Sequence, residues 1–374
     1  MRCLLFLFLA TTPLLQSATV DAWIGTFAEG ENAGAYRAKF DTETGKLSAP
    51  ERVAKVDRAG FLALSSDGSH AVTTANLQAD GEKKPSGHVV VWRMKDDAPW
   101  EEVARAVTGG GVCHVSFTAD GKTVLAANYG GGSVASFAFN KESGSLRRVS
   151  LIEHKGQGPH ERQKEAHAHA FVPLPGGRHA AAPDLGCDAV VVYEIDAGAS
   201  FVREVSRAST PPRAGPRHLA VGTDNKTIFV VNELDQTVGV FDWSAEEGKL
   251  KPLHVAAGRP DNLPVDGLTS AEIRVHPGGK FVYSSTRDLT DQGRDFITVF
   301  SVGSDRKLQA IQHVPAGVKI PRNFAISPDG KWLLAGGQAS NTIQVHRIDP
   351  ETGKLSPSGE PVACPAPVCF VFGK

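Results

Sequence analysis

The sequence predicts an all-β fold, a seven-bladed β-propeller with four antiparallel strands in each blade and a ring closed by the two chain ends. Three observations predict it. A unit of about fifty residues recurs along the chain, its apolar runs are short and strand-like, and the last such run finds a partner only at the N-terminus.

A small turn between two apolar runs marks each copy of the unit. The turns are Ser66-Asp-Gly, Ala119-Asp-Gly, Pro175-Gly-Gly, Thr223-Asp-Asn, Pro277-Gly-Gly and Pro328-Asp-Gly. Their third residues, at positions 68, 121, 177, 225, 279 and 330, are separated by 53, 56, 48, 54 and 51 residues. Such a period is typical of sheets repeated radially around an axis. A solenoid of helix pairs is excluded because no run keeps the 3.6-residue apolar period over ten or more positions.

The copies divide the chain into blades of four short strands. The predicted blades cover 22–56, 60–106, 111–153, 167–209, 216–257, 269–316 and 321–362. The first has only three strand candidates, 22–27, 35–41 and 52–56, whereas Pro367-Val-Cys-Phe-Val-Phe is an orphan at the C-terminus. Pairing the C-terminal strand with the N-terminal blade completes that blade and leaves no open sheet edge.

The first eighteen residues differ from the rest. They are apolar from Cys3 to Ala10 and end in small residues at Ser17 and Ala18, a stretch too short to span a bilayer. We expect 1–18 to be a secretory signal peptide and 19–374 to be a single propeller domain. The expected location is periplasmic or secreted. A disordered or anchoring N-terminus in a cytoplasmic protein is the alternative.

Charge excludes two classes of partner. The chain has 40 Lys and Arg against 41 Asp and Glu, a net charge of -1, and no basic run. We therefore expect neither nucleic acid nor, after signal removal, a membrane surface to be a partner. Nothing in the sequence determines the oligomeric state.

Four cysteines follow the signal segment, namely Cys113, Cys187, Cys364 and Cys369. In an oxidising compartment they allow three pairings, of which Cys364 with Cys369 is the nearest in sequence. Buried free thiols are an equal alternative, because Cys113 and Cys369 lie in inner-strand patterns.

The innermost strands of a propeller border its central channel, so functional residues are expected to recur at one repeat position. With the turns as register, the position of Arg217 holds Gly60, Cys113, His169, Arg217, Ala271 and Arg322. The next position holds Phe61, His114, Ala170, His218, Glu272 and Asn323. A packing layer would carry similar apolar residues, whereas these copies diverge into His, Arg and Glu, which indicates a binding pocket.

Three arginines are candidates for binding an anion. Arg217 and Arg322 occupy equivalent positions, each after a proline, and Arg274 follows Glu272 on the neighbouring inner strand. Guanidinium groups suit a carboxylate or a phosphate. The alternative is that each arginine pairs with an acid such as Glu233 or Glu272.

His167 and His169, in Ala166-His-Ala-His-Ala, lie two apart and are expected on one face of a strand. Zinc needs three protein ligands, and apart from His114 and His218 on other blades no third ligand suggests itself, so no metal is expected. Either histidine could be a satisfied core residue. The favoured role is general base or acid, because imidazole changes charge near neutral pH.

Glu233 is the last candidate. It follows the second strand of blade five. We align this position with Tyr129, Leu185, Thr286 and Gly337 in blades three, four, six and seven. A carboxylate one strand away from Arg217 could act as a base or neutralise that arginine. The sequence has no Gly-x-Ser-x-Gly, no phosphate loop and no Cys-x-x-Cys, so no cofactor is expected.

Seven ordered motifs resemble those of the seven-bladed lactonase family. They are Gly158 with Arg162-Gln163, Ala166-His-Ala-His, Asp184-Leu-Gly, Gly215-Pro-Arg-His, Asn232-Glu-Leu, Ser270-Ala-Glu-Ile-Arg and Pro321-Arg-Asn-Phe-Ala-Ile-Ser-Pro-Asp-Gly. The family includes propeller-type 6-phosphogluconolactonases and the fungal enzyme that interconverts carboxymuconate and its lactone. The resemblance runs from Trp23 to the C-terminus. Blade six departs from the family at Ser284-Ser-Thr-Arg-Asp-Leu-Thr-Asp-Gln-Gly, and blade seven departs at Asn323, where a histidine is common.

The resemblance implies hydrolysis of a sugar-type lactone without a cofactor. Its catalytic residues fall on His169 or His167, Arg217, Arg274 and Glu233. His169, assisted by Glu233, would deprotonate water, and Arg217 or Arg274 would stabilise the oxyanion. The expected substrate-binding residues are His167, Arg322, His218, Glu272 and Arg162. Two alternatives are a cyclase acting on a muconate-type dicarboxylate and a non-catalytic exported binding propeller.

Overall fold

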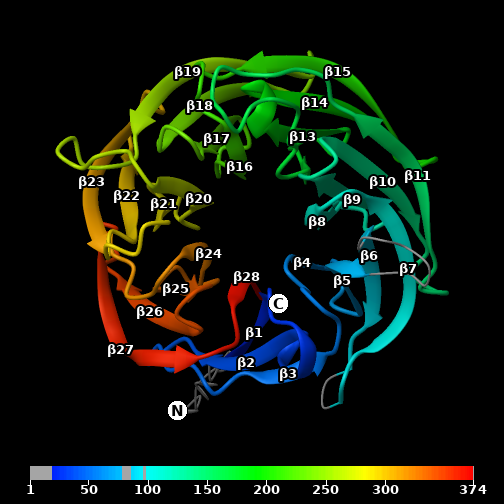
Figure 1. The fold of residues 1–374 in the computed structure, drawn as a ribbon, viewed down its shortest axis with the longest axis horizontal. Coiled ribbons are helices and arrows are strands. Elements are labelled where there is room, and N and C mark those ends of the chain that lie inside the picture. The colour runs from blue at the N-terminus through cyan, green and yellow to red at the C-terminus, as the bar shows by residue number, and fades with distance from the viewer. Residues whose placement is uncertain (1–18, 78–85, 96–97, 374) are drawn as a thin grey trace, which may run out of the picture.

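The computed structural model describes residues 19–77, 86–95 and 98–373. They form seven sheets of four antiparallel strands, arranged as a ring around a central axis (Figure 1). The predicted seven-bladed propeller is therefore confirmed. The expected signal peptide, 1–18, lies outside the described residues.

Each blade begins with its innermost strand. Blade one contains β28 (Pro367–Phe372), β1 (Thr19–Thr26), β2 (Ala35–Asp41) and β3 (Glu51–Ala54). Blade two contains β4 (Leu62–Leu64), β5 (His70–Leu77), β6 (Ser86–Arg93) and β7 (Glu101–Gly109). Blade three contains β8 (Val112–Phe117), β9 (Thr123–Asn128), β10 (Ser133–Phe139) and β11 (Leu146–Glu153). Blade four contains β12 (Val172–Pro173), β13 (His179–Asp184), β14 (Ala189–Asp196) and β15 (Phe201–Ser209).

The last three blades follow the same order. Blade five contains β16 (Pro216–Val221), β17 (Thr227–Asn232), β18 (Thr237–Ser244) and β19 (Lys249–Ala257). Blade six contains β20 (Leu268–Val275), β21 (Phe281–Asp288), β22 (Phe296–Val302) and β23 (Leu308–Pro315). Blade seven contains β24 (Pro321–Ile326), β25 (Trp332–Gly337), β26 (Thr342–Ile348) and β27 (Leu355–Ala363). Two single-turn 3₁₀ helices, η1 (Gly30–Asn32) and η2 (Leu185–Cys187), lie in loops.

The inner strand of blade four is shorter than expected. The predicted start at 167 is wrong, since β12 contains only Val172–Pro173, and the chain before it touches β13 through a single bridge, Ala168 to Asp184. The Asp184 carboxylate explains this irregularity. Its Oδ1 accepts a hydrogen bond from the backbone N–H of His167 at 2.8 Å, where a regular ladder would offer a carbonyl. The two candidate histidines therefore lie on an irregular extended segment.

A β-bulge recurs near the start of most inner strands. The pairing register shifts between Val112 and His114, between Pro216 and His218, and between Pro321 and Asn323. In β20 it shifts between Ser270 and Ile273. A bulged residue is left out of the ladder and its side chain is re-aimed. The bulges therefore turn Cys113, Arg217 and Arg322 toward the channel.

The C-terminal strand closes the ring as predicted, because β28 pairs antiparallel with β1 and is the innermost strand of blade one. We expect deletion of 367–374 to abolish the cooperative unfolding transition. The deletion exposes the partners of Val368 and Phe370, which are 3% and 2% exposed, at about 2 kcal/mol for each side chain, and also removes a strand's backbone pairing. Thermal unfolding measures the effect, with removal of only 373–374 as the control. A transition like that of the full chain would contradict ring closure.

The four cysteines after the signal segment are all free thiols in the structure, so the Cys364 to Cys369 disulfide is not formed. Cys113 and Cys369 lie on inner strands, as predicted. Within the described part of the chain, no helix is both long and apolar enough to cross a membrane.

Candidate active site

The central channel is divided into two pockets at opposite ends. The entry pocket, of about 560 Å³, lies where the chain enters the inner strands and is bordered by Tyr129, Arg162, His169, Glu233, Arg287 and Arg322. The exit pocket, of about 670 Å³, lies at the turns that leave those strands and is bordered by Phe61, His114, His218, Glu272, Arg274 and Cys369. Between them a void of only about 10 Å³ remains, enclosed by side chains that include Phe61, Arg217 and His218.

The structure therefore divides the predicted site residues into two groups. His169, Glu233, Arg162 and Arg322 border the entry pocket. His218, Glu272 and Arg274 border the exit pocket. Arg217 lies between the pockets. The expectation that Arg274, Glu272 and His218 share a pocket with Glu233 is wrong, because these three residues border the opposite end of the channel.

Glu233 holds three arginines at the entry pocket. Its Oε1 accepts hydrogen bonds from Arg162 Nη1 at 2.7 Å and forms an ion pair with Arg287 Nη2 at 3.2 Å, and its Oε2 accepts from Arg217 Nε at 2.8 Å. Burial alone would raise the pKa of the Glu233 carboxyl. Arg287, Arg217 and Arg162 outweigh burial and hold that pKa well below its usual range. Glu233 is therefore ionised at neutral pH and fixes the guanidinium groups around it.

Sequence comparison missed Arg287 because the alignment slipped by one residue in two blades. Pro216 pairs with Asn232 in blade five, and the equivalent Ser270 pairs with Thr286 in blade six. The residue equivalent to Glu233 is therefore Arg287, and in blade seven it is Gln338. The sequence spacing gives the same equivalence. Counting eight residues on from the third turn residue of blades five, six and seven, at 225, 279 and 330, leads to 233, 287 and 338.

Arg322 is the least compensated charge at this end of the channel. Among the described residues, no acid lies within ion-pair distance of its guanidinium group, which packs 5.0 Å from the ring centre of Phe27. Burial, and then repulsion from Arg217 and Arg287, lowers the pKa of Arg322. A bound anion would relieve that repulsion, so Arg322 is suited to hold an anionic group.

His169 is buried beside these arginines. Burial first, and then Arg217 and His218, lowers the pKa of His169 well below its ordinary value, so the imidazole is neutral at pH 7. Three buried atoms have no hydrogen-bond partner among the residues that the structure describes: His169 Nδ1, Arg287 Nε and Gln338 Oε1. All three residues border the entry pocket. Buried polar atoms rarely stay unpaired, so this clustering points to a ligand site.

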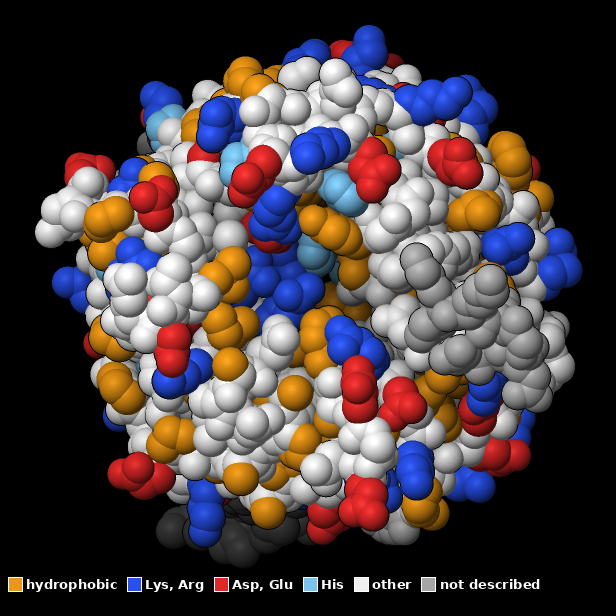
Figure 2. All heavy atoms as spheres, viewed as in Figure 1, with side chains coloured by type: hydrophobic (Ala, Val, Ile, Leu, Met, Phe, Trp, Pro, Cys, Tyr) orange, Lys and Arg blue, Asp and Glu red, His pale blue; other side chains and the backbone are white. Residues whose placement is uncertain are grey.

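The entry pocket is strongly cationic. Among its described lining residues, four are arginines and one is an acid: Arg58, Arg162, Arg287, Arg322 and Glu233. Figure 2 shows basic side chains gathered in the hollow at the middle of the ring.

His167 borders neither pocket. Its Nδ1–H donates to the backbone oxygen of Tyr129 at 2.9 Å, and its ring stacks on Tyr129.

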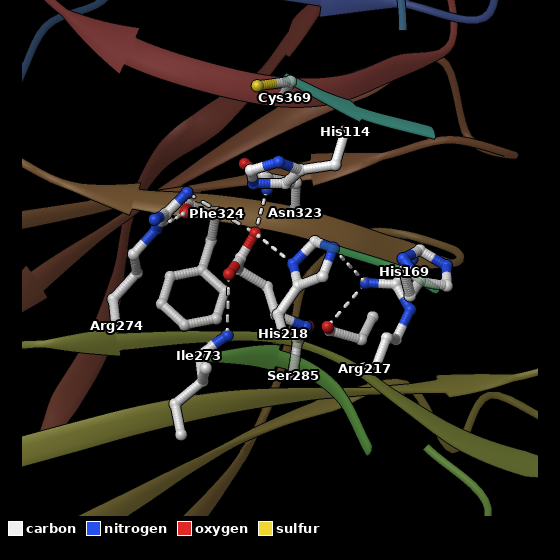
Figure 3. A network of polar contacts seen from close by, with 12 residues as sticks. His114, His169, Arg217, His218, Ile273, Arg274, Ser285, Asn323, Phe324 and Cys369 are labelled. Atoms are coloured by element: carbon white, nitrogen blue, oxygen red, sulfur yellow. Dashed lines mark hydrogen bonds and ion pairs between the residues drawn. The ribbon is translucent and has the colours of Figure 1, made fainter. Parts of the chain in front are cut away.

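The exit end is built around the Glu272 carboxylate. Figure 3 shows His218, Asn323 and Arg274 pointing toward it from three neighbouring strands. Burial opposes ionisation, but Arg274 and His218 lower the pKa of Glu272 to about 2. No group of three or more His, Cys, Asp or Glu side chains that could hold a metal ion is found in 19–77, 86–95 or 98–373.

Fold and site together define a β-propeller with a cationic small-molecule pocket at one end of its channel. Residues 21–372 match the family described as "Lactonase, 7-bladed beta-propeller", and the chain belongs to this family.

Similar proteins cover nearly the whole chain. The 6-phosphogluconolactonase of Bacillus subtilis (strain 168) is 30% identical over 94% of this chain and 97% of its own length. A 6-phosphogluconolactonase of Formosa agariphila is 28% identical over 89% of this chain and 94% of its own. The structure of a Pseudomonas aeruginosa periplasmic gluconolactonase matches with a TM-score of 0.86 at 25% identity, over 95% of this chain and 99% of that one.

Proposed function

We propose that the protein hydrolyses a sugar-type lactone bearing an anionic group, and that the reaction takes place in the entry pocket. The observation that carries the proposal is the entry pocket itself, where neutral His169 lies beside an excess of guanidinium groups and unpaired buried polar atoms. The relatives named 6-phosphogluconolactonase support this substrate class.

In the proposed reaction, His169 accepts a proton from water as the water oxygen attacks the lactone carbonyl. Arg287 or Arg217, held by Glu233, stabilises the oxyanion of the tetrahedral intermediate. The ring C–O bond then breaks, and His169 returns its proton to the leaving ring oxygen, giving the hydroxy acid. Arg322 binds the phosphate or carboxylate of the substrate.

Glu233 acts here as an anchor rather than as a second base. Its lowered pKa makes the carboxylate a weak proton acceptor at neutral pH, and its oxygens are occupied by three arginines. Of the two arginines expected to stabilise the oxyanion, Arg274 is replaced by Arg287 in this proposal, because Arg274 borders the exit pocket and Arg287 borders the entry pocket.

The test is turnover by the wild-type protein. Proton release from 6-phosphogluconolactone and from plain gluconolactone is measured against spontaneous opening. We expect acceleration of both, with the lower KM for the phosphorylated lactone. No acceleration of either would overturn the proposal.

The same cationic pocket also suits a dicarboxylate, which makes a muconate cyclase the second candidate. Incubation with carboxymuconate separates the two functions. Loss of its conjugated absorbance, without opening of either gluconolactone, would favour the cyclase.

We further propose that the protein is exported. Two observations support this proposal: the apolar segment 1–18, and the similarity of the fold to a periplasmic gluconolactonase. Mass spectrometry of the protein purified from its host is expected to find a mature N-terminus near residue 19. An intact Met1 in the purified protein would contradict export through a cleaved signal.

A further inference from the structure

The exit pocket is a second cavity that the proposed reaction does not use. Its volume of about 670 Å³ is within the range of small-molecule sites. Phe61 and His218 separate it from the entry pocket, since both residues border the exit pocket and the small central void. A ligand in one pocket therefore does not extend into the other.

The Glu272 carboxylate in the floor of this pocket is already satisfied by the protein. Its Oε1 accepts from the backbone N–H of Ile273 at 2.9 Å, and its Oε2 accepts from His218, Asn323 and Arg274 (Figure 3). The contacts of His218 define its tautomer. Arg217 Nη1 can only donate, so His218 Nε2 is the acceptor, and the ring hydrogen lies on Nδ1, which donates to Glu272 Oε2. Glu272 is therefore not the group that binds a ligand.

Arg274 has donor capacity left. Its contacts with Phe324 O and Glu272 Oε2 are both long, at 3.4 Å, and its side chain is 35% exposed. Among the described residues, its Nη1 has no hydrogen-bond partner. Half of the guanidinium fork is thus available to a ligand in the exit pocket.

His114 supplies a second donor. Its Nδ1 accepts from the backbone N–H of Phe171 at 3.4 Å, which places the hydrogen on Nε2. Within the described part of the chain that N–H has no protein partner, although the side chain borders the exit pocket and the residue is only 6% exposed. Burial, and then His218, lowers the pKa of His114, so the ring is neutral and keeps a single donor.

The charge and the walls of the exit pocket select the ligand. Among the described residues that line it are one arginine, Arg274, and three acids. Glu272 lies in the floor beside Arg274, whereas Asp21 and Asp67 form ion pairs with Lys39 and Lys141. The entry pocket has four arginines and one glutamate. A phosphate dianion would meet the Glu272 carboxylate without surplus positive charge, whereas a monoanion needs only Arg274. The walls contribute Trp23, Phe61, Leu219 and Val371, which favour an apolar body.

We propose that the exit pocket binds a small organic monocarboxylate with a compact apolar body, whose carboxylate is held by Arg274 and by the Nε2–H of His114. This site is separate from the lactone site and does not depend on the proposed hydrolysis.

Calorimetric titration with benzoate tests the proposal. The wild-type protein is expected to bind benzoate, with affinity reduced about tenfold or more in Arg274→Gln and unchanged in the matched Arg322→Gln, which removes an arginine from the other pocket. Benzamide, of the same shape without the charge, is expected to bind about tenfold more weakly. Loss of benzoate binding in Arg322→Gln but not in Arg274→Gln would overturn the proposal, as would benzamide binding equally well.

A second measurement needs no variant. Crystals of the wild-type protein soaked in 4-bromobenzoate are expected to show the bromine anomalous peak between the walls of the exit pocket. A peak only in the entry pocket, or none at a concentration that saturates the titration, would contradict the assignment.

Discussion

Glu233→Gln is expected to lower the free energy of unfolding by about 3–5 kcal/mol, because it leaves three buried or half-buried arginines without their shared counter-charge. Urea unfolding at pH 7 measures the loss. The matched control is Glu351→Gln, which removes the same charge from an exposed side chain and is expected to change little.

The effect of Glu233→Gln also has a defined pH dependence. The folded-state pKa of Glu233 lies below its unfolded value, so its contribution to stability is present above about pH 4.3 and is lost as the pH falls through the folded pKa. The wild type and the variant should therefore converge in stability in acid. An equal difference at pH 7 and pH 3, or no difference at pH 7, would contradict the anchoring role.

His169→Gln is expected to lower kcat by between about a hundredfold and ten-thousandfold, the usual contribution of a general base, with a small effect on KM. The control is His167→Gln, on the same segment, whose ring contacts Tyr129 rather than the entry pocket. We expect less than about a tenfold change there. The reverse ranking of the two variants would assign the base to His167.

The pH profile of the wild-type enzyme gives a further check on His169. Burial and Arg217 lower the pKa of His169, and a base works only when uncharged. The acid limb of kcat/KM should therefore lie below pH 6.5, the ordinary histidine value. A limb at or above 6.5 would indicate a different base. Spontaneous opening of the lactone is subtracted at every pH.

Most of the fold could be predicted because each copy of the repeat is marked by a short Gly, Asp or Asn turn between two apolar runs, and such turns can be recognised from the local sequence. In six blades the predicted bounds agree with the outer bounds of the strands within three residues. Blade four differs because its inner strand is interrupted by a tertiary contact, the Asp184 carboxylate on the His167 backbone. A side chain acting in place of a ladder bond leaves no trace in the periodicity of the sequence.

The site could be predicted only in part. The repeat position of Arg217 could be identified because the turn residues keep a nearly constant spacing to it, and the structure has a bulge at this position in blades three, five and seven. Arg287 was missed through a slip of one residue. Arg274 was grouped with Glu233 although it lies three residues beyond Ala271 on the same strand, or about 10 Å at the usual rise. That distance is enough to carry a side chain from one end of the channel to the other.

The most direct test of which end is the active one compares Arg322→Gln with Arg274→Gln on 6-phosphogluconolactone. The two variants remove the same charge from opposite pockets. We predict that Arg322→Gln raises KM by about ten- to a hundredfold, while Arg274→Gln keeps kcat/KM within about twofold of the wild type. Loss of turnover in Arg274→Gln with normal kinetics in Arg322→Gln would contradict the placement of lactone hydrolysis in the entry pocket.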